Sequence, residues 1–310
     1  MGVVGIGHLG NYHLQKYKLL PDVEIVGVAD VLQERSQKAA ALYGCKALTD
    51  HKDLIGKVDA VSITVPTRFH HAVAKDFLAA GIDVLLEKPM TVTLEEADDL
   101  IDVADQNGAI LQIGFVERFN PAVTALGQVI ENPMFVESHR LHPFIERGTD
   151  VDVVLDLMIH DLDIILHFVK SPVKNVEAVG VSVLSDKVDI SNVRVVFENG
   201  CVANITASRI TLKKLQKIRF FGLEGYHSVD FEKRELVSLS KTKGSDGKVR
   251  IGYNDVEVTP CDPLEEEIRA FMHSVETRTP PLVSGREGRK SLELAVNIVK
   301  QMKTGSELMP

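Results

Sequence analysis

The stretch VGIGHLGNYH, residues 4–13, sets Gly5, Gly7 and Gly10 in the pattern G-x-G-x-x-G. The run GVVG just before it reads as a short strand, and apolar residues at helical spacing follow it to about Leu20. A glycine-rich turn between a strand and a helix is typical of a phosphate-binding loop, because the N–H groups of the helix start point at the ligand. A dinucleotide-binding turn is therefore predicted if the next segments build a parallel sheet.

The first 120 residues meet that condition, because strands and helices alternate along them. Buried strands are expected at 23–30, 59–66, 82–89 and 109–115, with helices at 31–44, 67–80 and 94–107. Thr93 and Glu96 form a capping-box pattern at the start of the last helix. Such alternation predicts an α/β fold with a doubly wound parallel sheet, a Rossmann dinucleotide-binding domain.

Asp30 follows Gly10 by twenty residues and ends the second predicted strand. An acid in this place hydrogen-bonds the adenosine ribose hydroxyls and repels a 2′-phosphate, so we expect NAD rather than NADP. Arg35 lies close in sequence and weakens the distinction, because arginine accommodates that phosphate. The alternative is a glycine-rich turn without a ligand, which the placed strand, helix and acid together disfavour.

The second half of the chain reads differently. Strand-like runs are expected at 134–144, 176–184, 188–210, 217–222 and 226–231, and Asn199-Gly200 is a strong hairpin signal. Helices are expected at about 156–168, 264–276 and 287–303, and the polar stretch 240–248 reads as a long hairpin loop. We therefore expect residues 1–120 to form the NAD-binding domain. Residues 121–310 would form an α/β domain with an open, mainly antiparallel sheet, and the C-terminal helix is free to pack back on the first domain.

Composition excludes several classes of protein. The net charge of −9 argues against a nucleic-acid partner, and no apolar run reaches the length of a membrane span. The three cysteines, Cys45, Cys201 and Cys261, are far apart and odd in number, which favours a reducing compartment over a disulfide framework. No signal-peptide pattern is present, so we expect a cytoplasmic protein.

Two motifs carry residue types suited to redox chemistry. Lys88 follows Glu87 at the carboxyl end of a predicted parallel strand, where ligands of doubly wound sheets bind. Asp156 and His160 stand four residues apart, so on a helix they share one face, and a neutral-range imidazole suits proton transfer. The plainer readings are a surface lysine and a capping or core histidine. Zinc held by Asp156, His160 and His139 is a third reading that no compact ligand motif supports.

Other polar residues lie near the predicted strand ends. His70 and His71 follow Pro66, and one of them is expected to face the cofactor, although a place on the helix surface suits them equally. Arg118, in ERFNPA at 117–122, is expected at the junction of the two domains, and it stands among the candidate substrate contacts.

Taken together, these elements resemble the glucose-fructose oxidoreductase and inositol dehydrogenase (Gfo/Idh/MocA) family. The matching pieces run in the family's order along most of the chain: GIGHLG, Asp30, VPTRFHH, LLEKP, ERFNPA, DLMIHDLD and FENGCVANITASR. The resemblance implies a Rossmann domain, a second α/β domain with an open antiparallel sheet, and hydride transfer between a hydroxyl, usually of a sugar, and NAD or NADP.

The resemblance also implies roles for particular residues. Lys88 would contact substrate and nicotinamide, and Asp156 and His160 match the family's D-x-x-x-H pair, with the histidine as general acid/base. One departure concerns the pocket: Met158 stands where the family usually has glycine, and TDVDVVL replaces a glycine-rich run. We expect the cofactor to contact Gly5, Gly7, His8, Leu9, Gly10, Asp30, Thr64, Pro66, His70, Glu87 and Lys88.

The substrate is expected to be a nucleotide sugar. GHLG, VERFNPA and LDLMIHDLD look most like the branch of the family that oxidises the 3-hydroxyl of UDP-N-acetylglucosamine. Residues 201–221 contain five lysines and arginines and no acid, and basic side chains bind phosphate. The candidate cations are Arg209, Lys213, Lys214, Lys217 and Arg219, with His139, Arg140, His142 and Arg147 nearby. We expect substrate contacts from Lys88, Arg118, Arg140, Asp156, His160 and Arg209.

Alternatives remain for substrate, class and charge. A free sugar or inositol is the alternative substrate, and a solvated sheet face or an oligomer contact is the alternative role of the basic segment. A cofactor-binding regulator without turnover, or a redox-neutral use of NAD, is compatible with the same fold. Because an open sheet with apolar outer positions leaves a large patch in water, we expect a homodimer or homotetramer.

Overall fold

The computed structural model describes residues 1–144, 151–243 and 247–306, with side chains up to residue 302. It divides into two compact units, Met1–Val116 with Asp262–Arg289, and Glu117–Cys261 with the chain from Lys290 onward. A single boundary was expected at residue 120. The chain instead crosses to the second unit after Val116 and returns to the first unit for residues 262–289. In the described residues, we find no helix both long enough and apolar enough to cross a membrane.

The first unit holds a six-stranded parallel sheet in the order β3-β2-β1-β4-β5-β6. The order reverses between β1 and β4, which is the switch point where doubly wound folds bind their ligands. The strands are β1 (Gly2–Val4), β2 (Gly27–Ala29), β3 (Lys46–Leu48), β4 (Ala60–Ile63), β5 (Asp83–Glu87) and β6 (Leu111–Gly114). The Rossmann architecture predicted from the alternating pattern is confirmed.

The helices of this unit cover the sheet and pack against its apolar residues. They are α1 (His8–Tyr17), α2 (Gln33–Tyr43), α3 (His70–Ala79), α4 (Leu94–Asn107), α7 (Pro263–Thr277) and the first turns of α8 (Gly285–Ser306). The Thr93–Glu96 capping box begins α4 as predicted, and Gly108 ends it in the left-handed conformation. Ile268 and Phe271 of α7 belong to the same buried cluster as Val3 of β1. The core of the first unit is therefore completed by a helix that comes late in the chain.

The second unit holds an eight-stranded sheet in the order β14-β13-β12-β11-β7-β10-β9-β8. All neighbours are antiparallel except β7 and β10, which confirms the mainly antiparallel sheet. The strands are β7 (Phe135–Leu141), β8 (Val173–Val181), β9 (Ile190–Phe197), β10 (Val202–Ser208), β11 (Leu215–Phe221), β12 (Gly225–Asp230), β13 (Glu235–Lys243) and β14 (Val249–Tyr253). The Asn199-Gly200 hairpin joins β9 and β10, with Gly200 at a φ of +86°.

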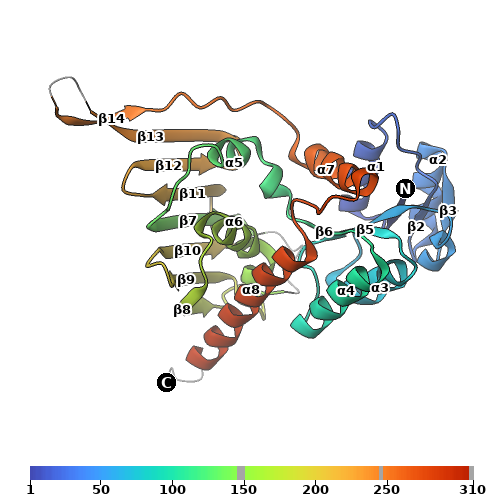
Figure 1. The fold of residues 1–310 in the computed structure, drawn as a ribbon. Coiled ribbons are helices and arrows are strands. Elements are labelled where there is room, and N and C mark those ends of the chain that lie inside the picture. Colours follow the sequence, from blue (N-terminus) through green and yellow to red (C-terminus); the bar gives the residue numbers. More distant parts are fainter. Residues whose placement is uncertain (145–150, 244–246, 307–310) are drawn as a thin grey trace. The chain divides into compact units, whose positions relative to one another are not determined.

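Helices α5 (Pro121–Leu126), α6 (Ile159–Val169) and the later turns of α8 lie along one face of this sheet (Figure 1). Two cross-links support α8 there: Ser291 Oγ lies 3.3 Å from Asp163 Oδ1, and Ser191 Oγ lies 3.2 Å from Met302 Sδ. Along β7, β9 and β10, buried residues that face the helices alternate with more exposed residues that point to the opposite face. The unit thus has one helix-covered face and one face that no described element of the unit covers.

Several expected boundaries were wrong. The strand expected at 23–30 is only Gly27–Ala29, and β3 was missed because its residues are mostly exposed and carry no apolar run. The stretch 240–248, expected to be a hairpin loop, is strand at its start, since β13 extends to Lys243; β14 begins at Val249. The expected helix at 156–168 begins instead as a π-helical turn, Val154–Met158, before α6.

Candidate active site

The glycine turn between β1 and α1 has the three properties that a pyrophosphate site needs. Gly5 has a φ of +91°, which favours glycine, and a Cβ on Gly10 would lie 2.1 Å from the Gly5 carbonyl oxygen. A Cβ on Gly7, by contrast, would meet nothing within 4 Å. The turn is therefore tight, packed closely against the helix, and open at Gly7. That arrangement fits a pyrophosphate at the start of α1, a ten-residue helix.

Asp30 stands beside this turn, directly after β2. Its Oδ2 accepts the Ile6 N–H at 2.7 Å, and its Oδ1 accepts the Leu32 N–H at 2.8 Å. The two hydrogen bonds fix the carboxylate against the glycine turn, while each oxygen keeps a second lone pair for a ribose hydroxyl. His8 and Leu9, at the start of α1, are exposed on the same edge of the sheet.

The segment after β4 also reaches the glycine turn. The Thr64 hydroxyl donates to the Gly5 carbonyl at 2.6 Å, and Pro66 follows exposed. His70, expected at the cofactor with the helix surface as its alternative place, is turned inward. It is buried, with Nδ1 2.9 Å from the Pro89 carbonyl oxygen and Nε2 2.8 Å from the Val65 carbonyl oxygen. The imidazole therefore links the loops after β4 and β5, and burial lowers its pKa.

His71 takes the surface place that was the alternative for this pair. Its Nε2 lies 2.6 Å from Asp99 Oδ2, and Lys75 Nζ lies 2.8 Å from the same oxygen. The contacts join α3 to α4 at the protein surface. They explain His71 without a cofactor.

Glu87, expected at the cofactor, is turned into the unit instead. Its Oε1 lies 3.0 Å from Nε2 of the fully buried His13, whose Nδ1 lies 3.0 Å from Ser62 Oγ. Tyr17 completes the network, with its hydroxyl 2.6 Å from Ser62 Oγ. The sequence analysis missed this network of His13, Ser62, Tyr17 and Glu87. The one signal for it is weak: His13 stands at a helical position that spacing places on the buried face of α1.

Lys88 follows directly and is half-buried at the carboxyl end of β5. The Glu87 Oε2 accepts the Lys88 backbone N–H at 3.3 Å, so the network reaches the main chain of the lysine. The Lys88–Pro89 peptide is cis. Lys88 thus shares one edge of the parallel sheet with Gly7, Asp30 and Thr64, as the sequence predicts.

Asp156 and His160 belong to the second unit. Asp156 lies in the π-helical turn and His160 in the first turn of α6, and both side chains are half-buried. Met158 and Ile159 between them are fully buried. Asp156 and His160 therefore stay accessible while Met158 points into the core. π-Helical turns are rare and occur frequently at functional sites.

Two expected substrate arginines are buried in ion pairs within the second unit. Arg140 holds Asp161 through two bonds of 2.8 and 3.2 Å and Glu117 through one of 3.1 Å, and its guanidinium lies 4.7 Å from the Phe231 ring centre. Arg118 is also buried, with Nε 3.7 Å from Asp163 Oδ2. These placements argue against direct substrate contacts, because the carboxylates already engage the guanidiniums.

Arg209 shows the same pattern, as it pairs with buried Asp189 at 2.8 Å. The remaining basic residues of 201–221 that lie on strands face the uncovered side of the sheet, where Lys217 pairs with Asp230 and Arg219 with Glu137. Lys214 pairs with Glu232. Arg147 lies outside the described residues. The oligomer-contact or solvated-face reading thus fits Lys217 and Arg219 better than a phosphate site does.

Zinc finds no support in this arrangement. Within the described residues, no group of three or more histidine, cysteine, aspartate or glutamate side chains is placed to hold a metal ion. His139 lies on β7, at a position that alternates with buried Ser138 and Arg140. It does not complete a cluster with Asp156 and His160.

Two family models match the chain. An oxidoreductase family model with an NAD-binding Rossmann fold (GFO/IDH/MocA) matches residues 1–115, and a GFO/IDH/MocA C-terminal domain model matches residues 125–227. The two matches fall on the halves that carry the glycine turn and the Asp156–His160 segment.

Full-length relatives agree with these matches. UDP-N-acetylglucosamine 3-dehydrogenase from Acidithiobacillus ferrooxidans is 38% identical, over 96% of this chain and 95% of its own. A solved structure of that enzyme superposes with a TM-score of 0.90 at 36% identity, covering 98% of this chain and 97% of the other. Myo-inositol 2-dehydrogenase from Thermotoga maritima is 29% identical over 97% and 96% of the two chains.

Proposed function

The chain belongs to the GFO/IDH/MocA family of NAD-binding oxidoreductases, and on that premise we propose that it oxidises the 3-hydroxyl of UDP-N-acetylglucosamine. The observation that carries this proposal is the 38% identity to an enzyme of that name along nearly the whole of both chains. The basic segment 201–221 adds nothing to it, because Arg209 is buried in an ion pair and Lys217 and Arg219 pair on a sheet face.

The two units have different roles in the proposed reaction. We propose that the first unit holds NAD, with the pyrophosphate at Gly5, Gly7 and Gly10 and the adenosine ribose at Asp30. The open space at Gly7 and the fixed Asp30 carboxylate support this assignment. The second unit would bind the sugar and present Asp156 and His160 to it.

Three side chains carry the proposed chemistry. His160 removes the proton of the substrate hydroxyl, Lys88 stabilises the developing negative charge on that oxygen, and Asp156 orients the substrate or the imidazole. The bound nicotinamide supplies the hydride acceptor. A well-placed acid/base group contributes about 10²–10⁴-fold to rate. Lys88, Asp156 and His160 are all half-buried, so part of each remains accessible to a ligand, which supports the assignment.

The decisive experiment is a substrate comparison. Purified protein with NAD is assayed for NADH against UDP-N-acetylglucosamine, free N-acetylglucosamine, glucose and inositol. We expect the highest kcat/KM with UDP-N-acetylglucosamine, and a higher value for an uncharged sugar overturns the assignment. Product without net NADH identifies redox-neutral use of the cofactor, and neither product nor NADH identifies a regulator. Inositol is the serious competitor because inositol dehydrogenases are also among the full-length relatives.

Cofactor choice is tested separately. We expect NAD to bind more tightly than NADP, because the Asp30 carboxylate repels a 2′-phosphate. Dissociation constants for both, measured by calorimetry on the wild type and on Asp30→Asn, decide the point. Tighter NADP binding by the wild type contradicts it, and an unchanged preference in the variant removes Asp30 as its cause.

We also propose a homodimer or homotetramer assembled through the uncovered face of the eight-stranded sheet. Strand register puts one outward row of apolar side chains across it: Val196, Val202, Phe135, Phe221, Tyr226, Leu239 and Tyr253. Ring centres of Phe135 and Phe221 are 5.4 Å apart, and those of Phe221 and Tyr226 are 5.0 Å apart. A contiguous apolar row of this kind is a typical contact between subunits.

A further inference from the structure

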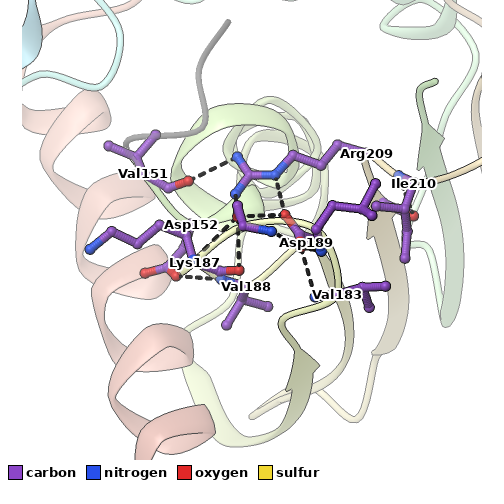
Figure 2. Close-up of polar contacts among 11 residues, drawn as sticks. Val151, Asp152, Val183, Lys187, Val188, Asp189, Arg209 and Ile210 are labelled. Atoms are coloured by element: carbon purple, nitrogen blue, oxygen red, sulfur yellow. Dashed lines mark hydrogen bonds and ion pairs between the residues drawn. The ribbon is translucent and has the colours of Figure 1, made fainter. Parts of the chain in front are cut away.

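Arg209, just beyond the end of β10, joins its own segment to two others in the second unit, the loop between β8 and β9 and the segment at Val151 (Figure 2). Its Nε donates to Asp189 Oδ1 at 2.8 Å, its Nη1 to the Val151 carbonyl at 2.9 Å, and its Nη2 to Ser185 Oγ at 3.1 Å. The guanidinium is buried, with only 3% of the residue exposed. A planar fork with several donors suits such a junction, and a lysine ammonium does not reproduce it.

Asp189 is the anionic centre of the junction. Its Oδ2 accepts three successive backbone N–H groups, from Val183 at 2.7 Å, Leu184 at 2.6 Å and Ser185 at 3.0 Å. Burial by itself raises the pKa of this carboxyl. The N–H of Leu184, the Ser185 hydroxyl and the other donors outweigh that effect and bring the pKa well below its usual value. The hydrogen bonds to this charged carboxylate therefore stabilise the conformation of the loop between β8 and β9.

That loop in turn holds the residues that lead into the candidate active site. The Val188 N–H donates to Asp152 Oδ1 at 3.0 Å, and the Val188 carbonyl accepts the Val153 N–H at 2.9 Å. The Asp152 carbonyl accepts the Asp156 N–H at 3.1 Å, at the start of the π-helical turn. Hydrogen bonds and adjoining main chain thus lead from Arg209 and Asp189 to the backbone of Asp156.

We infer that Arg209 and Asp189 are positioning residues, which hold residues 151–153 and so set the place of Asp156 and His160 relative to the substrate. This inference rests on the catalytic roles proposed above for Asp156 and His160. It gives Arg209 a part in catalysis without a substrate contact. A displacement of about 1 Å at a reacting group costs up to about 100-fold in rate, so a loosened entry to this helix reduces turnover.

The test uses Arg209→Lys and Asp189→Asn, with Ser185→Ala as a milder variant that removes a single hydroxyl. Arg269→Lys is the matched control, because Arg269 forms an exposed pair with Glu265 on α7. Amide hydrogen exchange by mass spectrometry, with native protein and no substrate, reports on residues 151–160. Steady-state kinetics with UDP-N-acetylglucosamine and calorimetry with NAD report on function.

We expect exchange at 151–160 to rise in the three variants, while peptides from β7 and β11 keep their protection. We expect kcat to fall about 10- to 100-fold in Arg209→Lys and Asp189→Asn, with the dissociation constant of NAD within about twofold of the wild type. The control should match the wild type in every measurement.

Unchanged exchange at 151–160 overturns the inference, and so does faster exchange there with unchanged turnover. A general loss of protection across the second unit in all three variants also overturns it, because that result identifies a role in stability alone. Absence of any turnover by the wild type contradicts the proposed function instead, and the exchange result stands apart from it.

Discussion

Nε2 of His13 lies 3.0 Å from Oε1 of Glu87, and both residues are buried although 74 positions separate them. The pair links α1 to the end of β5, directly before Lys88. The other imidazole nitrogen, Nδ1, is hydrogen-bonded to Ser62 Oγ, so both ring nitrogens of His13 have a partner. The residues that support the lysine from below are therefore buried in the first unit.

His13→Ala should lower the free energy of unfolding by about 1–3 kcal/mol, the cost of leaving buried hydrogen-bonding groups unmet. Urea denaturation without cofactor measures it. His8→Ala is the control, since His8 is exposed on the same helix, and its change should stay within about 0.5 kcal/mol. Equal effects of the two substitutions would show that the His13–Glu87 contact contributes nothing.

Glu267 predicts a pH dependence of stability. It is fully buried on α7, and burial, followed by the charge of Glu87, raises its pKa. The folded state then binds this proton more tightly than the unfolded state, so the contribution of Glu267 to stability is complete below about pH 4.3 and is lost as the pH rises through the folded pKa. Glu267→Gln should flatten this fall in urea titrations at pH 5 and pH 8.

The exposed neighbour Glu266 provides the control for that experiment. Glu266→Gln should retain the wild-type difference in stability between pH 5 and pH 8. If Glu267→Gln retains it as well, the buried carboxyl is not the source of the pH dependence.

Gly7 and Gly10 should separate cofactor binding from folding. Gly10→Ala forces a Cβ to 2.1 Å from the Gly5 carbonyl oxygen, so we expect a lower melting temperature and no measurable NAD binding. Gly7→Ala meets no protein atom within 4 Å, so the melting temperature should hold while NAD binding weakens at least about tenfold. Calorimetry and thermal unfolding give both values. Normal NAD affinity in Gly7→Ala would place the pyrophosphate elsewhere.

Lys88→Ala and His160→Ala should each reduce turnover by at least about 100-fold, the low end for a lost charge-stabilising donor and for a lost acid/base group. The dissociation constant of NAD should change much less, because the glycine turn and Asp30 remain intact. Pre-steady-state NADH formation shows whether hydride transfer limits the rate. Near wild-type turnover under that condition would remove the residue from the mechanism.

Assembly should depend on the apolar row of the uncovered sheet face. Light scattering at micromolar concentration should give a dimer or tetramer for the wild type, and Phe221→Glu should shift it to monomer by burying a charge at the contact. Leu42→Glu is the control, because Leu42 is 65% exposed on α2 of the other unit. A monomeric wild type refutes the proposed assembly.

The sequence by itself determined the Rossmann unit and the edge of the sheet that holds its site. These features depend on local patterns: the spacing of Gly5, Gly7 and Gly10, apolar strands that alternate with helices, and Asp30 at a strand end. Because the carboxyl ends of parallel strands share one edge, Lys88 and Thr64 follow from strand assignment alone. The Asn199-Gly200 hairpin and the α4 capping box were equally local.

Only the tertiary structure decided which polar groups face inward. Arg140 and Arg209 stand in basic segments that read as a phosphate site, yet each is buried against a carboxylate distant in sequence. Glu87 and His70 turn inward for the same reason: a buried polar group must find a partner, and the partner is supplied by another element. Pairing of that kind is set by packing between elements, which periodicity along one chain segment does not encode.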